Sequence, residues 1–238
     1  MKKLSIIIPV YNEAQTIAEV IRIIAGLELI EGIQKEVIVI NDCSTDHTGS
    51  EISKAVAEIG ANFIQVLLHQ KNAGKGGAIH TGIQKATGDY IIIQDADLEL
   101  EPAEINLLIE QVVKHGADIV YGSRFLGQKV KGGSALSNAA NGFLTWLSNV
   151  IFRIKITDME TCYKLIKTEM AQSLKLKERR FGFEPEVTAK LSRIPNVRIY
   201  EVGISYYGRT YEEGKKIGWK DGFRAIWCIH KYNIWSRR

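Results

Sequence analysis

Cysteine, proline and long apolar runs are all scarce in this sequence of 238 residues. The 3 cysteines form no Cys-x-x-Cys pair, which argues against a disulfide framework or a zinc site and favours a reducing, cytoplasmic setting. With only 4 prolines, the chain is not collagen-like or proline-rich. No run reaches the roughly 18 apolar residues of a membrane span, so we expect no transmembrane helix. The apolar run after Lys3 is too short for a signal peptide.

Neither sign of charge dominates. Lys and Arg number 31 against 27 Asp and Glu, a net charge of +4, far below that of a dedicated nucleic-acid-binding protein. We therefore expect no nucleic-acid partner. Hydrophobic residues make up 45% of the chain and charged residues 24%, a balance that allows a globular core.

Apolar runs of strand length alternate with helical patterns along the first half of the chain. The expected strands are 4–10, 36–40, 63–68, 90–94 and 119–122, with helices at 17–24, 52–59, 78–86 and 105–113 between them. Strands that are buried on both faces and alternate with helices predict an α/β fold. We expect a Rossmann-like, mostly parallel sheet flanked by helices, with ligands beyond the carboxyl ends of its strands.

The alternation changes after Asp118. We expect a long amphipathic helix at 136–154, strands at 157–166 and 197–207, and a helix around 183–193. The apolar stripe of the long helix comprises Leu136, Ala140, Phe143, Leu147, Ile151 and Ile154. No internal repeat or low-complexity linker interrupts the chain, so 1–238 is expected to be a single domain.

Asp95 and Asp97 follow a buried strand in the segment QDADLE. Two carboxylates one residue apart in a loop can face the same side, and their oxygens are ligands that Mg²⁺ and Mn²⁺ prefer. Asp is also a common helix cap, so Asp97 could instead cap the next helix while Asp95 ends the strand. The segment predicts either a divalent metal site that binds a diphosphate or a capped helix.

A glycine-rich turn, HQKNAGKGG, leads into another predicted helix. Its lysines, Lys71 and Lys75, and the N–H groups of a helix start suit an anion. The turn is not a Walker loop, which would need glycine at His69, nor a dinucleotide turn, which would need glycine at Ile79. An ordinary turn is the alternative to an anion site.

Five segments occur together in one order: IIIPVYNE, VINDCSTDHT, NAGKGGAIHTG, GDYIIIQDADLE and YGSR. In this combination, residues 4 to about 124 resemble the family 2 glycosyltransferases with the GT-A fold. The second half, with TDMETCYKLI, FGFEPEVTAKL and ISYYGRTYEEGKKIGWKDG, resembles the branch of dolichol-phosphate mannose synthase and bacterial polyprenyl-phosphate glycosyltransferases. The resemblance implies a nucleotide-sugar-binding half (1–118), an acceptor half (119–210) and a basic, Trp-containing tail (211–238).

The resemblance also implies roles for individual residues. We expect the nucleotide sugar to contact Pro9, Tyr11, Glu13, Asp42, Gly74, Lys75, Asp95, Ala96 and Lys215. A Mg²⁺ or Mn²⁺ ion is expected on Asp95, Asp97 and Glu99. The expected catalytic residues are Asp97, Arg124, Asp158 and Arg209.

The implied reaction is an inverting displacement of a nucleoside diphosphate from a UDP- or GDP-sugar. Negative charge develops on the leaving phosphate, and a divalent metal and basic side chains stabilise it. A polyprenyl phosphate of the dolichyl or undecaprenyl type is the expected acceptor; it is already ionised and needs no base. A hydroxyl of a glycan or cell-wall intermediate is the alternative, and it would need a carboxylate, Asp158 first and Glu186 second. A third interpretation is a nucleotide-sugar-binding module without turnover.

Two segments combine apolar residues with nearby basic residues, as helices at a membrane interface do. The stretch 136–154 lies close to Lys129 and Arg153, and the tail contains Trp227 and Trp235 among basic residues. An apolar stripe is more often part of a protein core. We therefore expect either contact with the cytoplasmic face of a membrane or packing inside the domain.

Overall fold

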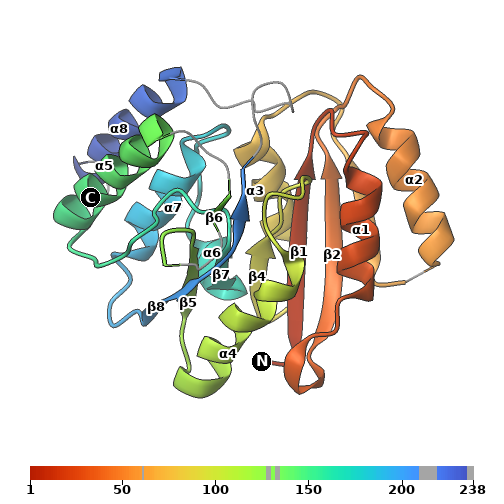
Figure 1. Ribbon diagram of the computed structural model, residues 1–238, viewed down its shortest axis with the longest axis horizontal. Coiled ribbons are helices and arrows are strands. Elements are labelled where there is room, and N and C mark those ends of the chain that lie inside the picture. The colour runs from red at the N-terminus through yellow and green to blue at the C-terminus, as the bar shows by residue number, and fades with distance from the viewer. Residues whose placement is uncertain (61, 127–129, 132–134, 209–218, 235–238) are drawn as a thin grey trace.

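Continuous runs of isoleucine and valine form the centre of a seven-stranded sheet (Figure 1). The computed structural model describes residues 1–60, 62–126, 130–131, 135–208 and 219–234. The strand order is β3-β2-β1-β4-β7-β5-β8. The strands are β1 (Lys3–Val10), β2 (Gln34–Asn41), β3 (Ile64–Leu68), β4 (Tyr90–Ile93), β5 (Ile119–Ser123), β7 (Lys164–Lys167) and β8 (Ile199–Gly203). Only β7 runs antiparallel to its neighbours in this sheet, so the predicted mostly parallel sheet is confirmed.

Eight α-helices are described around the sheet. In the view of Figure 1, α1 and α2 lie on the right and α5, α7 and α8 lie on the left. The helices are α1 (Ile17–Gly26), α2 (Thr48–Ile59), α3 (Lys75–Lys85), α4 (Ile105–His115), α5 (Ala135–Phe152), α6 (Thr168–Ser173), α7 (Phe183–Leu191) and α8 (Trp219–Ile234). Two 3₁₀ turns, η1 (Ile30–Gly32) and η2 (Pro102–Glu104), and a small parallel pair, β6 (Val130–Lys131) with β9 (Tyr206–Tyr207), complete the described elements.

The strand predicted at 157–166 is mostly a loop. Pairing with the neighbouring strands begins only at Lys164, and residues 157–163 lie outside the sheet. The reason is chemical: the side chains of Asp158 and Cys162 bind partners on other elements, Arg124 and Asp95. The helix α6 was not predicted either. The reversed direction of β7 was not predicted because apolar periodicity does not report strand direction.

The predicted apolar stripe of 136–154 coincides only in part with the buried face of α5, because Leu147 and Ile151 pack partly buried against the core. Helix α5 buries Leu144, Thr145, Ser148 and Phe152, whereas Phe143 from the stripe is 51% exposed. Thr145 and Ser148 belong to the buried face because small polar side chains fit there, and Thr145 Oγ1 accepts a hydrogen bond from the backbone N–H of Met159. The side chain of Leu136 lies outside the described residues.

No helix in the described parts of the chain combines the length and hydropathy that crossing a bilayer requires. Helix α5, the longest of the described helices, has 18 residues. Its buried positions include Thr145 and Ser148.

Helix α3 lies very close to the sheet because Gly82 has no side chain. A Cβ atom at this position would lie 2.4 Å from Cγ2 of Ile7 and 3.0 Å from Cδ1 of Ile40. Both isoleucines are fully buried in β1 and β2. The first residues of α3 form part of the functional site described below, so this contact fixes the position of that site on the sheet.

We expect Gly82→Ala to lower the free energy of unfolding by about 1–3 kcal/mol, because the added methyl group overpacks the α3–sheet contact. Gly142→Ala is the matched control. A Cβ atom there meets no described atom within 4 Å, and alanine favours the helix by about 0.5–1 kcal/mol. Urea denaturation of the two variants measures the difference. Equal midpoints would contradict the packing argument.

Candidate active site

The predicted site residues gather at one edge of the sheet. Asp42 follows β2, Asp95 follows β4 and Arg124 follows β5, so three parallel strands deliver them to the edge at their carboxyl ends. Because β7 is antiparallel, its first residue, Lys164, lies at this same edge. The loop 157–163, which precedes β7, therefore lies at the same edge as the loops that follow the parallel strands.

Asp42 holds the glycine-rich turn in place. Its Oδ1 accepts a hydrogen bond from the N–H of Ala73 at 2.8 Å, and its Oδ2 accepts one from the N–H of Gly74 at 2.7 Å. His69 Nδ1 lies 2.7 Å from Oδ1. Gly74 has φ +81°, and a Cβ atom there would lie 2.4 Å from the carbonyl oxygen of Arg179. Asp42 thus organises the turn, and its contact with a nucleotide base stays a prediction.

Lys75 begins α3 and faces the acidic segment after β4. Its Nζ lies 2.7 Å from Oδ1 of Asp95 and 3.8 Å from Oε1 of Glu184 on α7. Burial favours the neutral amine of Lys75. The negative charges around it, that of Asp95 above all, outweigh this effect and raise the pKa of Lys75 well above its ordinary value. The site therefore contains a fixed positive charge at a helix start, the arrangement that binds a phosphate group.

The first loop of the chain packs beside this acidic segment. Thr16 Oγ1 donates a hydrogen bond of 2.7 Å to the carbonyl oxygen of Ala96. Glu13 is held through its backbone N–H, which donates to Thr48 Oγ1 at 2.9 Å. Pro9 is paired inside the sheet with Ile40, and the Tyr11 ring is 37% exposed. The loop that follows β1 and the loop that follows β4 are therefore neighbours, and both contain residues that we expect to contact the nucleotide sugar.

The carboxylates expected to bind a metal lie on one short loop. Asp97 is 8% exposed, and its Oδ1 accepts a hydrogen bond from the N–H of Glu99. Tyr206 Oη donates to Glu99 Oε2 at 3.2 Å, and burial with the charge of Glu99 raises the pKa of Tyr206 to about 12. The oxygen donors suit Mg²⁺ or Mn²⁺. As placed, the described residues form no group of three or more side chains able to hold a metal. A metal ion on Asp95, Asp97 and Glu99 therefore stays a prediction.

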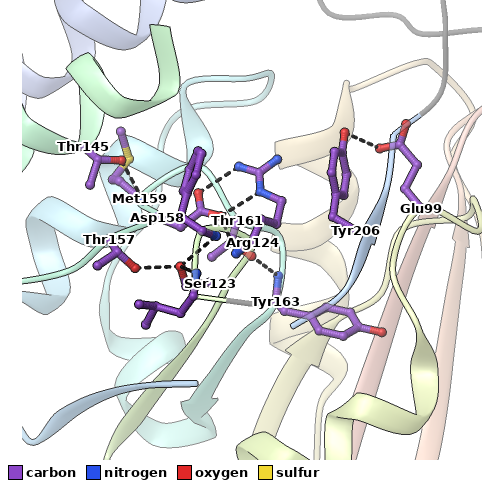
Figure 2. Close-up of polar contacts among 12 residues, drawn as sticks. Glu99, Ser123, Arg124, Thr145, Thr157, Asp158, Met159, Thr161, Tyr163 and Tyr206 are labelled. Carbon is purple, nitrogen blue, oxygen red and sulfur yellow. Dashed lines mark hydrogen bonds and ion pairs between the residues drawn. The ribbon is translucent and has the colours of Figure 1, made fainter. Parts of the chain in front are cut away.

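Arg124 is fixed by Asp158 (Figure 2). Asp158 is fully buried and accepts hydrogen bonds from Nε at 2.7 Å, Nη2 at 2.8 Å and the backbone N–H of Arg124 at 3.0 Å. Burial opposes the charge of Arg124, but Asp158 prevails and raises its pKa. The guanidinium also lies 5.2 Å from the centre of the Tyr206 ring. Asp158 is thus placed as the residue that orients Arg124.

The loop 157–163 links the arginine to the acidic segment. At one end, Asp158 binds Arg124; at the other, Cys162 Sγ lies 2.9 Å from Oδ2 of Asp95. Tyr163 Oη donates a 2.5 Å hydrogen bond to Gln94 Oε1. Sequence reasoning missed Cys162 and Tyr163. Their position directly before a short apolar strand was the available signal, but their partners lie 67 and 69 residues away.

Glu186 is also held by structural contacts. It is fully buried, and its oxygens accept hydrogen bonds from the backbone N–H groups of Lys177 and Glu178. Lys190 Nζ lies 2.7 Å from Oε1, an ion pair between residues four apart on α7. Two other predicted site residues, Arg209 and Lys215, lie outside the described residues.

Residues 5–174 match the model of the family named Glycosyl transferase family 2. The chain belongs to this family. The expected family resemblance is therefore confirmed.

Curated relatives fall in the expected branch. The undecaprenyl-phosphate 4-deoxy-4-formamido-L-arabinose transferase of Enterobacter sp. is 40% identical over 119 residues, 50% of this chain and 36% of that protein. The dodecaprenyl-phosphate galacturonate synthase of Rhizobium johnstonii is 26% identical over 224 residues, 94% of this chain and 64% of that protein. The chain thus spans less than two thirds of the length of each.

Solved structures show the same fold. Glucosyl-3-phosphoglycerate synthase from Mycobacterium tuberculosis, in complex with Mn²⁺, UDP and phosphoglyceric acid, gives a TM-score of 0.68 at 19% identity, covering 98% of this chain and 79% of that one. TarS of S. aureus in complex with UDP gives a TM-score of 0.63 at 20% identity, covering 98% of this chain and 65% of that one. The family 2 fold of this protein is therefore GT-A.

We expect Asp158→Asn to lower the free energy of unfolding by about 3 kcal/mol, because it removes one partner of a buried ion pair and leaves the guanidinium of Arg124 without a counter-ion. Glu110→Gln breaks an exposed ion pair with Lys114 and is expected to cost less than about 1 kcal/mol. Urea denaturation compares the two. Unchanged stability of Asp158→Asn would contradict the ion-pair argument.

Proposed function

We propose that this protein is a metal-dependent, inverting glycosyltransferase that moves a sugar from a nucleotide sugar to a polyprenyl phosphate. The proposal depends on one observation: the two carboxylates considered as bases, Asp158 and Glu186, are both engaged in contacts inside the protein. Asp158 binds Arg124, and Glu186 binds Lys190 and two backbone N–H groups. A hydroxyl acceptor needs a base within reach, whereas an ionised phosphate does not. The names of the relatives from Enterobacter and Rhizobium, which refer to undecaprenyl and dodecaprenyl phosphate, support the same acceptor class.

The donor side of the site is suited to a leaving diphosphate. Asp95 and Asp97, with Glu99 beside them, would hold Mg²⁺ or Mn²⁺, which supplies positive charge against the diphosphate. Lys75 provides a second, fixed positive charge at the start of α3. Together these groups stabilise the negative charge that develops as the bond to the sugar breaks. A UDP- or GDP-sugar is the proposed donor, and the solved neighbour with UDP and Mn²⁺ supports this class of ligand.

The acceptor side is suited to a phosphate group. Arg124 is held in one orientation by Asp158, and a guanidinium fixed in this way binds phosphate oxygens through paired hydrogen bonds. The loop 157–163 connects this arginine to Asp95 on the donor side. An acceptor phosphate at Arg124 would therefore lie close to the sugar, on the side away from the leaving diphosphate.

A membrane surface is the proposed location of the acceptor. Helices α5 and α8 lie side by side (Figure 1). Both helices expose large apolar side chains. We call this set the α5–α8 patch: Phe143, Trp146, Val150, Phe223 and Trp227, each more than half exposed. Aromatic rings favour the interface between lipid and water. We propose that the patch rests on the cytoplasmic face of the membrane that holds the polyprenyl phosphate.

We expect transfer of labelled sugar to undecaprenyl phosphate in detergent to require both a divalent metal and Asp97. Asp97→Asn weakens metal binding and is expected to lower turnover at least about 100-fold. The exposed variant Glu110→Gln is the control and keeps wild-type turnover. The assay screens UDP- and GDP-sugars with Mg²⁺, Mn²⁺ or EDTA. Transfer only to a hydroxyl acceptor, or nucleotide binding without transfer to either acceptor, would overturn the proposal.

We expect the double variant Trp146→Ser and Trp227→Ser to bind anionic phospholipid vesicles at least about tenfold more weakly than wild type, because two interfacial aromatic side chains are lost. Both rings are mostly exposed, so the fold is retained. Replacing Val66, an exposed residue on the far edge strand β3, with serine is the control. Vesicle co-sedimentation measures binding. Unchanged binding of the double variant would place the membrane contact elsewhere.

A further inference from the structure

Glu160 occupies the middle of the loop that joins the two sides of the site. The loop is fixed two residues earlier by Asp158 on Arg124 and two residues later by Cys162 on Asp95. Glu160 has no such contact: its Oε1 atom is buried and has no hydrogen-bond partner among the described residues. A buried carboxyl oxygen without a partner is costly, so its presence here calls for an explanation.

The surroundings of Glu160 determine its charge. Glu184 from α7 and Asp158 from the same loop are like charges, while Lys164 of β7 and Arg124 after β5 oppose them. Burial is the largest influence, and with Glu184 it raises the pKa of Glu160 to about 8. The group is therefore protonated at neutral pH, and a protonated carboxyl can donate a hydrogen bond.

We propose that the protonated Glu160 carboxyl donates a hydrogen bond to the acceptor phosphate bound at Arg124. This inference rests on the proposed function, since it names a second group that recognises the same acceptor. An ionised carboxylate beside Arg124 would repel a phosphate dianion, whereas a neutral carboxyl adds a donor without adding charge. Glu160 is then a specificity-determining residue for a phosphate acceptor, and the proton stays on its carboxyl throughout transfer.

The pH dependence follows from the direction of the pKa change. As the pH rises through about 8, Glu160 loses its proton, so kcat/KM for undecaprenyl phosphate is expected to fall about tenfold per pH unit above that value. The second ionisation of a phosphate monoester, near pH 6, is complete over this range and adds no change of its own. Glu160→Gln keeps an N–H donor but does not titrate. It is expected to keep kcat/KM within about threefold of wild type at pH 7 and to lack the decline above pH 8.

Glu160→Ala and Glu169→Gln complete the test. Glu160→Ala removes the donor and is expected to raise the KM for the acceptor about tenfold, with the KM for the nucleotide sugar unchanged. Glu169 is an exposed residue of α6, and Glu169→Gln keeps the wild-type pH profile. Melting temperatures report folding, and the nearly isosteric Gln variant carries the test if the Ala variant does not fold.

The outcomes separate this inference from the proposed function. A wild-type enzyme that transfers no sugar to undecaprenyl phosphate overturns the proposed function and this inference with it. A wild-type enzyme that does so, paired with a Glu160→Gln variant that shows the same alkaline decline, overturns the inference alone. A folded Glu160→Gln variant without turnover at any pH also overturns it, because Glu160 would then accept a proton as a base.

Discussion

The direction of strand β7 determines how the site is assembled. All other pairings in the main sheet are parallel, so each of those strands delivers its following loop to one edge. Strand β7 runs the other way between β4 and β5, and it delivers its preceding loop, 157–163, to that edge. A parallel strand in this position would have placed the loop at the opposite edge. The contacts of Asp158 with Arg124 and of Cys162 with Asp95 would then be lost.

The two halves of the chain are stabilised by different interactions. In the first half, aliphatic side chains such as Ile6, Ile38 and Ile92 fill the space on both faces of the sheet and are almost completely buried. In the second half, buried carboxylates hold elements together: Asp158 fixes the loop before β7, and Glu186 fixes the turn before α7. Burying a charge opposes folding unless a partner compensates, so each of these carboxylates has several hydrogen-bond donors.

This difference explains how much the sequence predicts. Apolar periodicity is a local signal, and it located β1, β2 and β4 and the placement of Asp95 and Asp97 in a loop after β4. The arrangement of 157–163 depends on partners far away in the chain, which no local pattern contains. Helix α5 shows a related failure. Its apolar residues surround the helix, so the pattern alone did not reveal that Ser148 is buried while Phe143 is exposed.

Helix α8 is connected to the glycine-rich turn through two consecutive residues. The Glu178 carboxylate binds Arg224 at 2.6 Å and Lys231 at 2.8 Å, both on α8. The carbonyl oxygen of the next residue, Arg179, accepts a hydrogen bond from the N–H of Gly77 at 3.1 Å. A Cβ atom at Gly74 would displace that same carbonyl, so the close approach needs glycine. The helix that carries Trp227 and the start of α3, where Lys75 lies, therefore contact one and the same segment, residues 178–179.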